Sequence, residues 1–268
     1  NTYGGGTVID GINGTGAVTV DAASSFGTGG VRMLPSARLR VGAASNLASG
    51  REVSVFSTPA ALGYVGMAFS GMAPISADSA GIVGVDTASF TQALDMSGIG
   101  DGLMALGSFS GGTYGTGTLS AGADNRYRLG GGGGILTFSQ ADVLGGSAAS
   151  VEIGSATMGG NGTVRFNDAQ GHALPVNVVH GSTLQGVGQL AEDASPFGKG
   201  AIRLDGGVLQ LINNGTETYS TNSSLTFAGG GRLLFSVVDW QVNSMQFEDL
   251  VRDTTHRGTL VFSAANLG

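Results

Sequence analysis

Short stretches in which apolar and polar residues alternate recur along almost the whole chain. They occur at 6–9, 17–20, 31–33, 37–41, 52–56, 135–138, 150–154, 163–166, 201–204, 208–212, 223–226, 232–237 and 259–263. Most are bounded by Gly, Asn, Asp or Ser, which favour turns. Helical periodicity is weak, and the one short helix it predicts spans 87–96, where Phe90, Ala93 and Leu94 share a face. The pattern predicts an all-β chain of many short strands.

Two phrases of the sequence repeat at matching spacing. Residues 23–33 read ASSFGTGGVRM and residues 194–204 read ASPFGKGAIRL, each followed by a turn and an alternating strand. The match predicts that Phe26 and Phe197 have the same role. We expect each ring to lie in a repeating core, with a ligand-binding aromatic as the alternative.

A second repeat places a cluster of glycines directly before a strand. It occurs at 4–9, 131–138, 159–166, 228–235 and 256–262. Strand starts recur at intervals of about 15 to 30 residues, which is the length of one coil of a parallel β-solenoid. An antiparallel sandwich also has short, regularly spaced strands. The repeated glycine corner favours the solenoid.

Composition narrows the possible partners. The chain has 50 glycines and 5 prolines in 268 residues, 41% hydrophobic residues, 12% charged residues and a net charge of −7. Glycine without a three-residue period excludes collagen, and the apolar content excludes a disordered linker. No basic patch favours nucleic acid or an anionic membrane. No apolar run approaches the length of about 20 residues that a membrane-spanning helix needs.

Three stretches carry a resemblance to a known family. NTYGGGTVIDG at the N-terminus, SSFGTGGVRM at 24–33 and YRLGGGGG from Tyr127 to Gly134 resemble the autotransporter-associated β-strand repeat. The copy at 166–204 departs further from the pattern, because FNDAQGHALPVNVV replaces its first part. The resemblance implies a right-handed parallel β-helix with glycine-rich corners and one or two irregular insertions. It also implies the passenger of a large bacterial surface protein, extracellular or on the outer-membrane surface of a Gram-negative cell, with no enzymatic activity and no cofactor.

The organisation expected from these repeats is one continuous β-solenoid segment over 1–268. We expect this segment to belong to a longer chain, because neither end shows a cap and ANLG at the C-terminus would continue into NTYGGGT. Residues 57–100 are the least repeat-like and are expected to form an insertion, a lateral contact or a small subdomain.

Few residues are candidates for a functional site. Tyr64 and Phe69 are where we would look for an exposed aromatic patch, and Asp239 is a carboxylate directly beside Trp240, the single tryptophan. These four are possible ligand or assembly contacts, with packing on a coil as the alternative. The most charged stretch, 245–257, is expected to be a solvated loop or short helix, with a polysaccharide contact second.

No motif for catalysis or metal binding is present in the sequence. The three histidines are scattered without zinc spacing, cysteine is absent, and no G-x-S-x-G elbow occurs. Single aspartates in glycine-rich turns are typical turn formers, so calcium binding, if any, is expected to be incidental. We therefore expect no catalytic, cofactor or metal residues.

Three functions remain as hypotheses. The first is a structural segment of an extracellular fibre or stalk, whose partner is the same protein, end to end or side by side. The second is an adhesin that binds a host or matrix ligand on the flank of the solenoid. The third, a polysaccharide-degrading β-helix enzyme, requires three or more carboxylates beside an arginine on one face.

Overall fold

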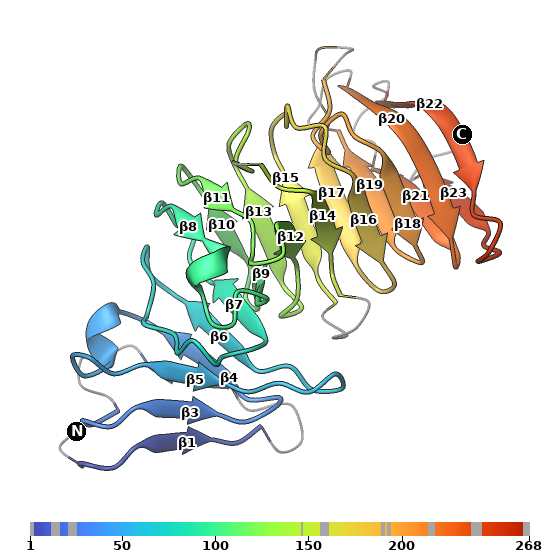
Figure 1. Ribbon diagram of the computed structural model, residues 1–268. Helices are drawn as coiled ribbons and strands as arrows, with labels where there is room; N and C mark the ends of the chain where they lie inside the picture. The colour runs from blue at the N-terminus through green and yellow to red at the C-terminus, as the bar shows by residue number, and fades with distance from the viewer. Residues whose placement is uncertain are drawn as a thin grey trace.

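The chain folds into stacked coils of parallel β-strands, a β-solenoid, in the computed structural model (Figure 1). The structure describes residues 3–11, 17–20, 26–145, 147–155, 161–188, 191, 194–213, 218–236 and 243–264. Within these ranges the helical elements are two 3₁₀-helices, η1 (Ala44–Asn46) and η2 (Met96–Gly98). The all-β prediction is therefore confirmed.

One sheet, the long sheet, runs the length of the molecule. Its eleven strands are β2 (Ala17–Val20), β4 (Arg38–Val41), β6 (Tyr64–Met67), β7 (Ile82–Val85), β9 (Ala105–Gly107), β12 (Arg126–Leu129), β14 (Ser150–Ile153), β16 (Val176–Val179), β18 (Ile202–Asp205), β20 (Thr218–Ala228) and β22 (Asn243–Arg252). Neighbours are parallel and follow chain order. Tyr64 pairs with Ile82 after 18 residues and Val176 with Ile202 after 26. These coil lengths lie within the predicted interval.

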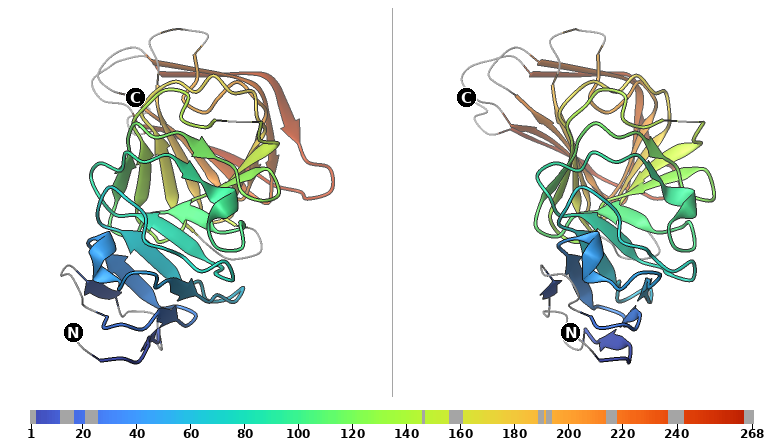
Figure 2. Two further views of the ribbon diagram at one scale, coloured as in Figure 1. Left: turned by 60° about the vertical axis from the view of Figure 1, so that its left-hand side comes forward. Right: turned by 90° about the vertical axis from the view of Figure 1, so that its left-hand side faces the viewer.

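The other sheets form further sides of the coil, which Figure 2 shows viewed more nearly along the stack. The N-terminal sheet comprises β1 (Thr7–Ile9), β3 (Val31–Met33) and β5 (Val53–Val55). The C-terminal sheet comprises β10 (Gly112–Tyr114), β13 (Ile135–Phe138), β15 (Thr163–Phe166), β17 (Thr183–Val187), β19 (Val208–Ile212), β21 (Gly231–Ser236) and β23 (Leu260–Ala264). A short pair joins β8 (Leu94–Asp95) to β11 (Leu119–Ser120).

Most coils add a strand to a second sheet beside the long sheet, and this second sheet is the N-terminal sheet in the first coils and the C-terminal sheet in the later ones. It changes sides along the stack. In the N-terminal coils its strand comes before the long-sheet strand across a short turn, as β3 ends at Met33 and β4 begins at Arg38. In the C-terminal coils its strand comes after, as β16 ends at Val179 and β17 begins at Thr183. The two sheets therefore lie at opposite ends of the long-sheet strands. Between them, isolated bridges link Val53 to Ile75 and Phe90 to Tyr114.

This change of side falls within 57–100, the segment that the sequence marks as least repeat-like. The long sheet continues through it as β6 and β7, whose residues are all buried. Figure 1 shows that the strands run across the picture in the N-terminal coils and up and down it in the C-terminal coils. The irregular stretch thus contains ordinary long-sheet strands, and what differs in it is the position of the second sheet.

Inward side chains stack from coil to coil to form the core. Along the C-terminal sheet and the bridge that precedes it, the ring centroids of Phe90 and Tyr114 lie 5.5 Å apart, those of Tyr114 and Phe138 5.5 Å, and those of Phe138 and Phe166 4.9 Å. We call these four rings the ring column. Such spacings are typical of attractive aromatic pairs. The column continues the strand register, because each ring occupies the same position one coil later.

The repeated phenylalanines Phe26 and Phe197 both lie in this core. Their phrases nevertheless precede strands of different sheets, because Phe26 leads into β3 and Phe197 into β18. The Phe197 ring also lies over Gly186, the position that follows Phe166 in register. A Cβ at Gly186 would lie 2.5 Å from the Phe197 ring. A ring from another side of the coil thus continues the column.

The glycine run 130–134 turns the chain between β12 and β13. Gly130, Gly131, Gly132 and Gly133 all have positive φ, from +83° to +103°, a region that favours glycine. A Cβ at Gly131 would lie 2.6 Å from the Ile82 side chain. The run therefore folds closely over an earlier coil, which side chains would prevent.

Two local predictions are wrong. Residues 87–96 do not form a helix, because the backbone amides of Phe90 and Leu94 donate to Thr113 and Thr118 of the next coil at 2.8 and 3.0 Å. Residues 245–252, expected in a loop or short helix, belong to β22, the last strand of the long sheet. Pairing with β20 supplies backbone partners, so the charged side chains can face solvent.

Candidate functional site

A groove crosses the outer face of the long sheet from β7 to β20. It consists of two hollows of about 560 and 270 Å³, and both are lined by Arg126, Glu152 and Asn177. Residues of β12 alternate between the core and this outer face, so Arg126 and Arg128 face outward while Tyr127 and Leu129 are buried. Strand alternation thus gathers polar side chains on one surface.

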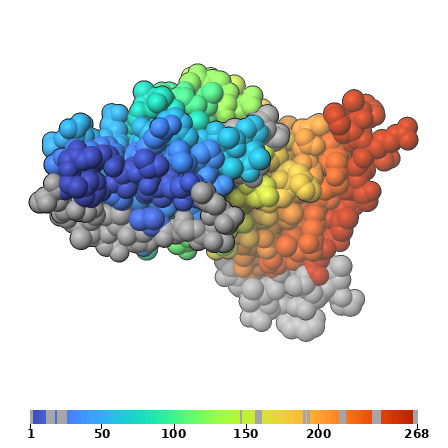
Figure 3. Space-filling model, turned by 90° about the horizontal axis from the view of Figure 1, so that it is seen from below, coloured from blue at the N-terminus to red at the C-terminus, as the bar shows by residue number. Residues whose placement is uncertain are grey.

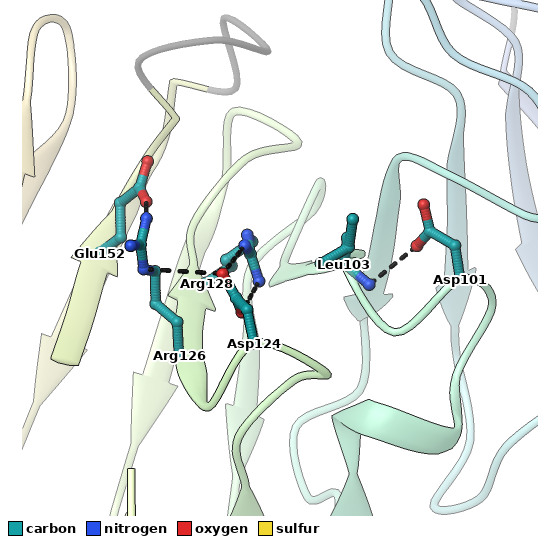
Figure 4. Close-up of polar contacts among 6 residues, drawn as sticks. All are labelled: Asp101, Leu103, Asp124, Arg126, Arg128 and Glu152. Carbon is teal, nitrogen blue, oxygen red and sulfur yellow. Dashed lines mark hydrogen bonds and ion pairs between the residues drawn. The ribbon is translucent and has the colours of Figure 1, made fainter. Parts of the chain in front are cut away.

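Three arginines of the groove each pair with a carboxylate. Arg126 Nη1 donates to Glu152 Oε2 at 3.0 Å, and Arg128 Nη1 donates to Asp124 Oδ1 at 2.8 Å (Figure 4). Arg203, further along the groove, lies 2.8 Å from Asp253. The pairs are partly exposed, so they contribute little stability.

Hydrogen-bond partners lower the pKa values of two of these carboxylates, Asp124 and Asp253. The hydrogen bond from Arg128 holds the pKa of Asp124 below its usual range. The pKa of Asp253 is lowered first by the backbone N–H of His256 and then by Arg203. Both carboxylates are therefore ionised at neutral pH, and each neutralises an arginine.

Asn177 occupies the centre of the groove. It pairs in register with Glu152 on one side and with Arg203 on the other. Its Oδ1 is buried and has no hydrogen-bond partner. A buried acceptor that lacks a donor is costly, and such atoms often identify a place for water or a ligand.

One end of the groove is apolar. Leu103 is 47% exposed there, and Leu62 and Ile82 line the same hollow. The Leu103 backbone N–H donates to Asp101 Oδ1 at 2.8 Å, which fixes the loop that carries it (Figure 4). The groove therefore joins an apolar wall to a row of charged and amide groups.

Of the residues selected from the sequence, Tyr64 and Phe69 do not line the groove. Tyr64 is 2% exposed, and Phe69 is half-buried against the core. Asp239 and Trp240 lie outside the described residues. Sequence reasoning missed the groove, although the spacing of Arg126, Arg128 and Glu152 on two alternating strands was the signal that could have found it.

Tyr64 belongs to a buried polar cluster with Asp86. Its Oη donates to Asp86 Oδ2 at 2.7 Å, and the other carboxylate oxygen accepts from Ser108 Oγ and from the Phe109 and Ser110 backbone N–H groups. Burial, with the Asp86 charge, raises the pKa of Tyr64. Every acceptor here has a donor, so the cluster ties 108–110 to the long sheet and presents no surface to a ligand.

Neither a metal centre nor a known relative gives a further indication of function. No group of three or more His, Asp or Glu side chains in the described part of the chain is arranged to hold a metal ion. No helix in that part is long and apolar enough to span a bilayer. Comparison with protein-family models, curated proteins and solved structures found no match to the chain.

Proposed function

We propose that the chain is a non-enzymatic structural segment of an extracellular bacterial fibre, stalk or surface-protein passenger. The observation that carries the proposal is the long sheet, whose eleven parallel strands follow chain order from one end of the described structure to the other. Stacked coils of this kind form stiff rods whose repeats contact only their neighbours. The resemblance of the glycine phrases to autotransporter repeats supports the bacterial surface as the location.

The proposed partner is the same protein, either as a further part of the same chain or as another copy. Strands β22 and β23 expose Leu250, Val261 and Phe262, and β1 exposes Val8 at the opposite end. Figure 3 shows the first and last coils at opposite ends of an elongated surface. Exposed apolar strands at a sheet edge favour pairing with another strand.

Electron microscopy of native material, labelled with an antibody raised against this segment, tests the proposal. We expect labels at regular spacing along continuous fibres. Labels confined to short discrete particles would contradict it. As the control for antibody specificity, the same material is digested to single segments and labelled with the same antibody.

The second candidate function is ligand binding on the flank, as in an adhesin. The groove around Asn177 favours it, because packing within the described coils does not account for an acceptor without a donor. An enzyme is less well supported, because the carboxylates Asp101 and Glu152, which line the groove, each already have a partner: Glu152 pairs with Arg126, and Asp101 accepts the Leu103 backbone N–H. Release of reducing ends from soluble polysaccharides would test that alternative.

A further inference from the structure

We propose that the groove binds a neutral polysaccharide chain lying along the stack, across β12, β14, β16 and β18. The inference rests on the second proposed function, binding on the flank, and names its site and ligand class. It does not depend on fibre assembly. Spacing, charge and the apolar wall of the groove each support it.

The groove offers one polar side chain per coil at a fixed interval. Arg128, Glu152, Asn177 and Arg203 occupy one register line across four neighbouring strands. Neighbouring strands lie about 4.8 Å apart, so the line extends over about 14 Å. A sugar unit in an extended polysaccharide has a length comparable to this spacing between neighbouring strands. A chain lying along the stack therefore meets a new side chain with each unit.

Charge within the groove favours a neutral ligand. Arg126, Arg128 and Arg203 are each paired with a carboxylate, so an acidic polymer would have to displace those partners. A hydroxyl both donates and accepts, and it can bridge an arginine N–H and a neighbouring carboxylate oxygen without breaking the pair. Adjacent hydroxyls of a sugar match this alternation of donors and acceptors.

Asn177 has a specific place in this scheme. Its Oδ1 lacks a donor in the described structure, and the side chain lines both hollows. Because that oxygen is buried, the proposal requires the amide to turn toward the groove, where the oxygen accepts from a ligand hydroxyl. Binding thus supplies a hydrogen bond that the protein does not make by itself.

The apolar wall suits the C–H face of a sugar ring. Leu103 is exposed beside the charged row, and Leu62 and Ile82 extend the wall. A peptide that adds as a strand needs an unpaired sheet edge. The groove lies across the face of paired strands, where the backbone groups already bond to neighbouring strands. Recognition there depends on side chains.

Isothermal titration calorimetry of the 268-residue chain tests the proposal with four hexasaccharides. Three are neutral (cellohexaose, laminarihexaose and maltohexaose), and hexagalacturonate is the acidic comparison. We expect at least one neutral hexamer to bind. We expect Asn177→Ala to weaken that binding at least tenfold and Leu103→Asp at least fivefold.

The matched control is Gln185→Ala. Gln185 is an amide on the outer face of a β-strand as Asn177 is, but it lies in the C-terminal sheet and bonds to Arg165 and Gln210. We expect this variant to bind as the unaltered chain does. Circular dichroism checks the fold of each variant, and light scattering of the same samples follows assembly separately.

Three results would overturn the inference: no neutral hexamer binds, only hexagalacturonate binds, or Asn177→Ala and Leu103→Asp both bind as the unaltered chain does. Each of these can occur with assembly intact, so failure of the groove is distinguishable from failure of the fibre. Leu103 is exposed, so its variant remains informative if Asn177→Ala reduces stability.

Discussion

Replacement of Phe138 by alanine tests whether the ring column stabilises the solenoid. Phe138 is fully buried and lies between two rings, with centroids at 5.5 Å to Tyr114 and 4.9 Å to Phe166. Removal of the ring leaves a cavity in the middle of the column. Neighbouring coils cannot close it, because the parallel ladder fixes their spacing.

The expected cost follows from burial and ring contacts. Phe→Ala changes in protein cores cost about 3–5 kcal/mol. Each aromatic pair contributes about 0.5–1.5 kcal/mol beyond burial. Because Phe138→Ala removes two such ring pairs, we expect a cost in the upper part of the range for protein cores, which is a decrease in the free energy of unfolding of about 4–5 kcal/mol.

Urea denaturation followed by far-ultraviolet circular dichroism measures this change. The comparison is valid if the dependence on urea concentration is the same for both proteins. Phe262→Ala is the control, since Phe262 is a phenylalanine on β23 that is 60% exposed. We expect it to cost less than about 1 kcal/mol. A loss below about 1.5 kcal/mol for Phe138→Ala would refute the argument.

Three further predictions test other parts of the core. Gly186→Ala places a methyl group against the neighbouring ring and should cost about 1–3 kcal/mol by urea denaturation, whereas Gly98→Ala, which has open space, should cost less. Burial raises the pKa of Tyr114 and of Tyr127 to about 12, above the usual value of about 10. The contribution of these two tyrosines to the free energy of unfolding is therefore complete below pH about 10 and is lost as pH rises toward 12. Between these pH values, Tyr127→Phe should reduce the slope of the free energy of unfolding against pH by about 1.4 kcal/mol per pH unit. Tyr64→Phe removes a donor to a buried carboxylate and should lower the free energy of unfolding by about 1.5–3 kcal/mol.

These predictions also have clear contrary outcomes. Equal costs for the two glycine variants would remove the case for close packing at Gly186. An unchanged alkaline slope in Tyr127→Phe would mean that this tyrosine titrates alike in the folded and unfolded chains. Unaltered stability in Tyr64→Phe would mean that the other donors alone satisfy the carboxylate.

Alternation predicted most of the regular strands. Each of the thirteen ranges selected by alternation overlaps a strand. In most of these strands one face lies in the core and the other meets solvent, which produces the alternation. The same rule fails for β6 and β7. Their sequences YVGM and IVGV are buried on both faces, since 108–110 and the glycine run cover the outer face there.

Pairing between coils was harder to predict. The charged sequence of β22 is typical of a loop, and only its pairing with β20 makes it a strand. Phe26 and Phe197 follow the same phrase, yet their strands enter different sheets. The phrase specifies a buried ring followed by a strand, while the neighbouring coil determines the partner.

The candidate site depends on this register even more strongly. Glu152 and Asn177 are 25 residues apart in the chain and become neighbours only through the pairing of β14 with β16. Aromatic residues attracted attention in the sequence because they often bind ligands. In Tyr64 the ring lies instead over the small residues of the long sheet, where a Cβ at Gly84 would lie 1.8 Å from its hydroxyl.

The change of side of the second sheet has a mechanical consequence. Over most of the stack, tension along the axis is shared by two ladders of hydrogen bonds. Between β5 and β10 the second ladder is reduced to isolated bridges at Ile75 and Phe90 and is supplemented only by the short β8–β11 pair in the described structure, so the long sheet carries most of the load there. When such a rod is pulled, we therefore expect the coils between β6 and β9 to extend before the coils on either side, with the buried cluster around Asp86 as the main side-chain link that resists.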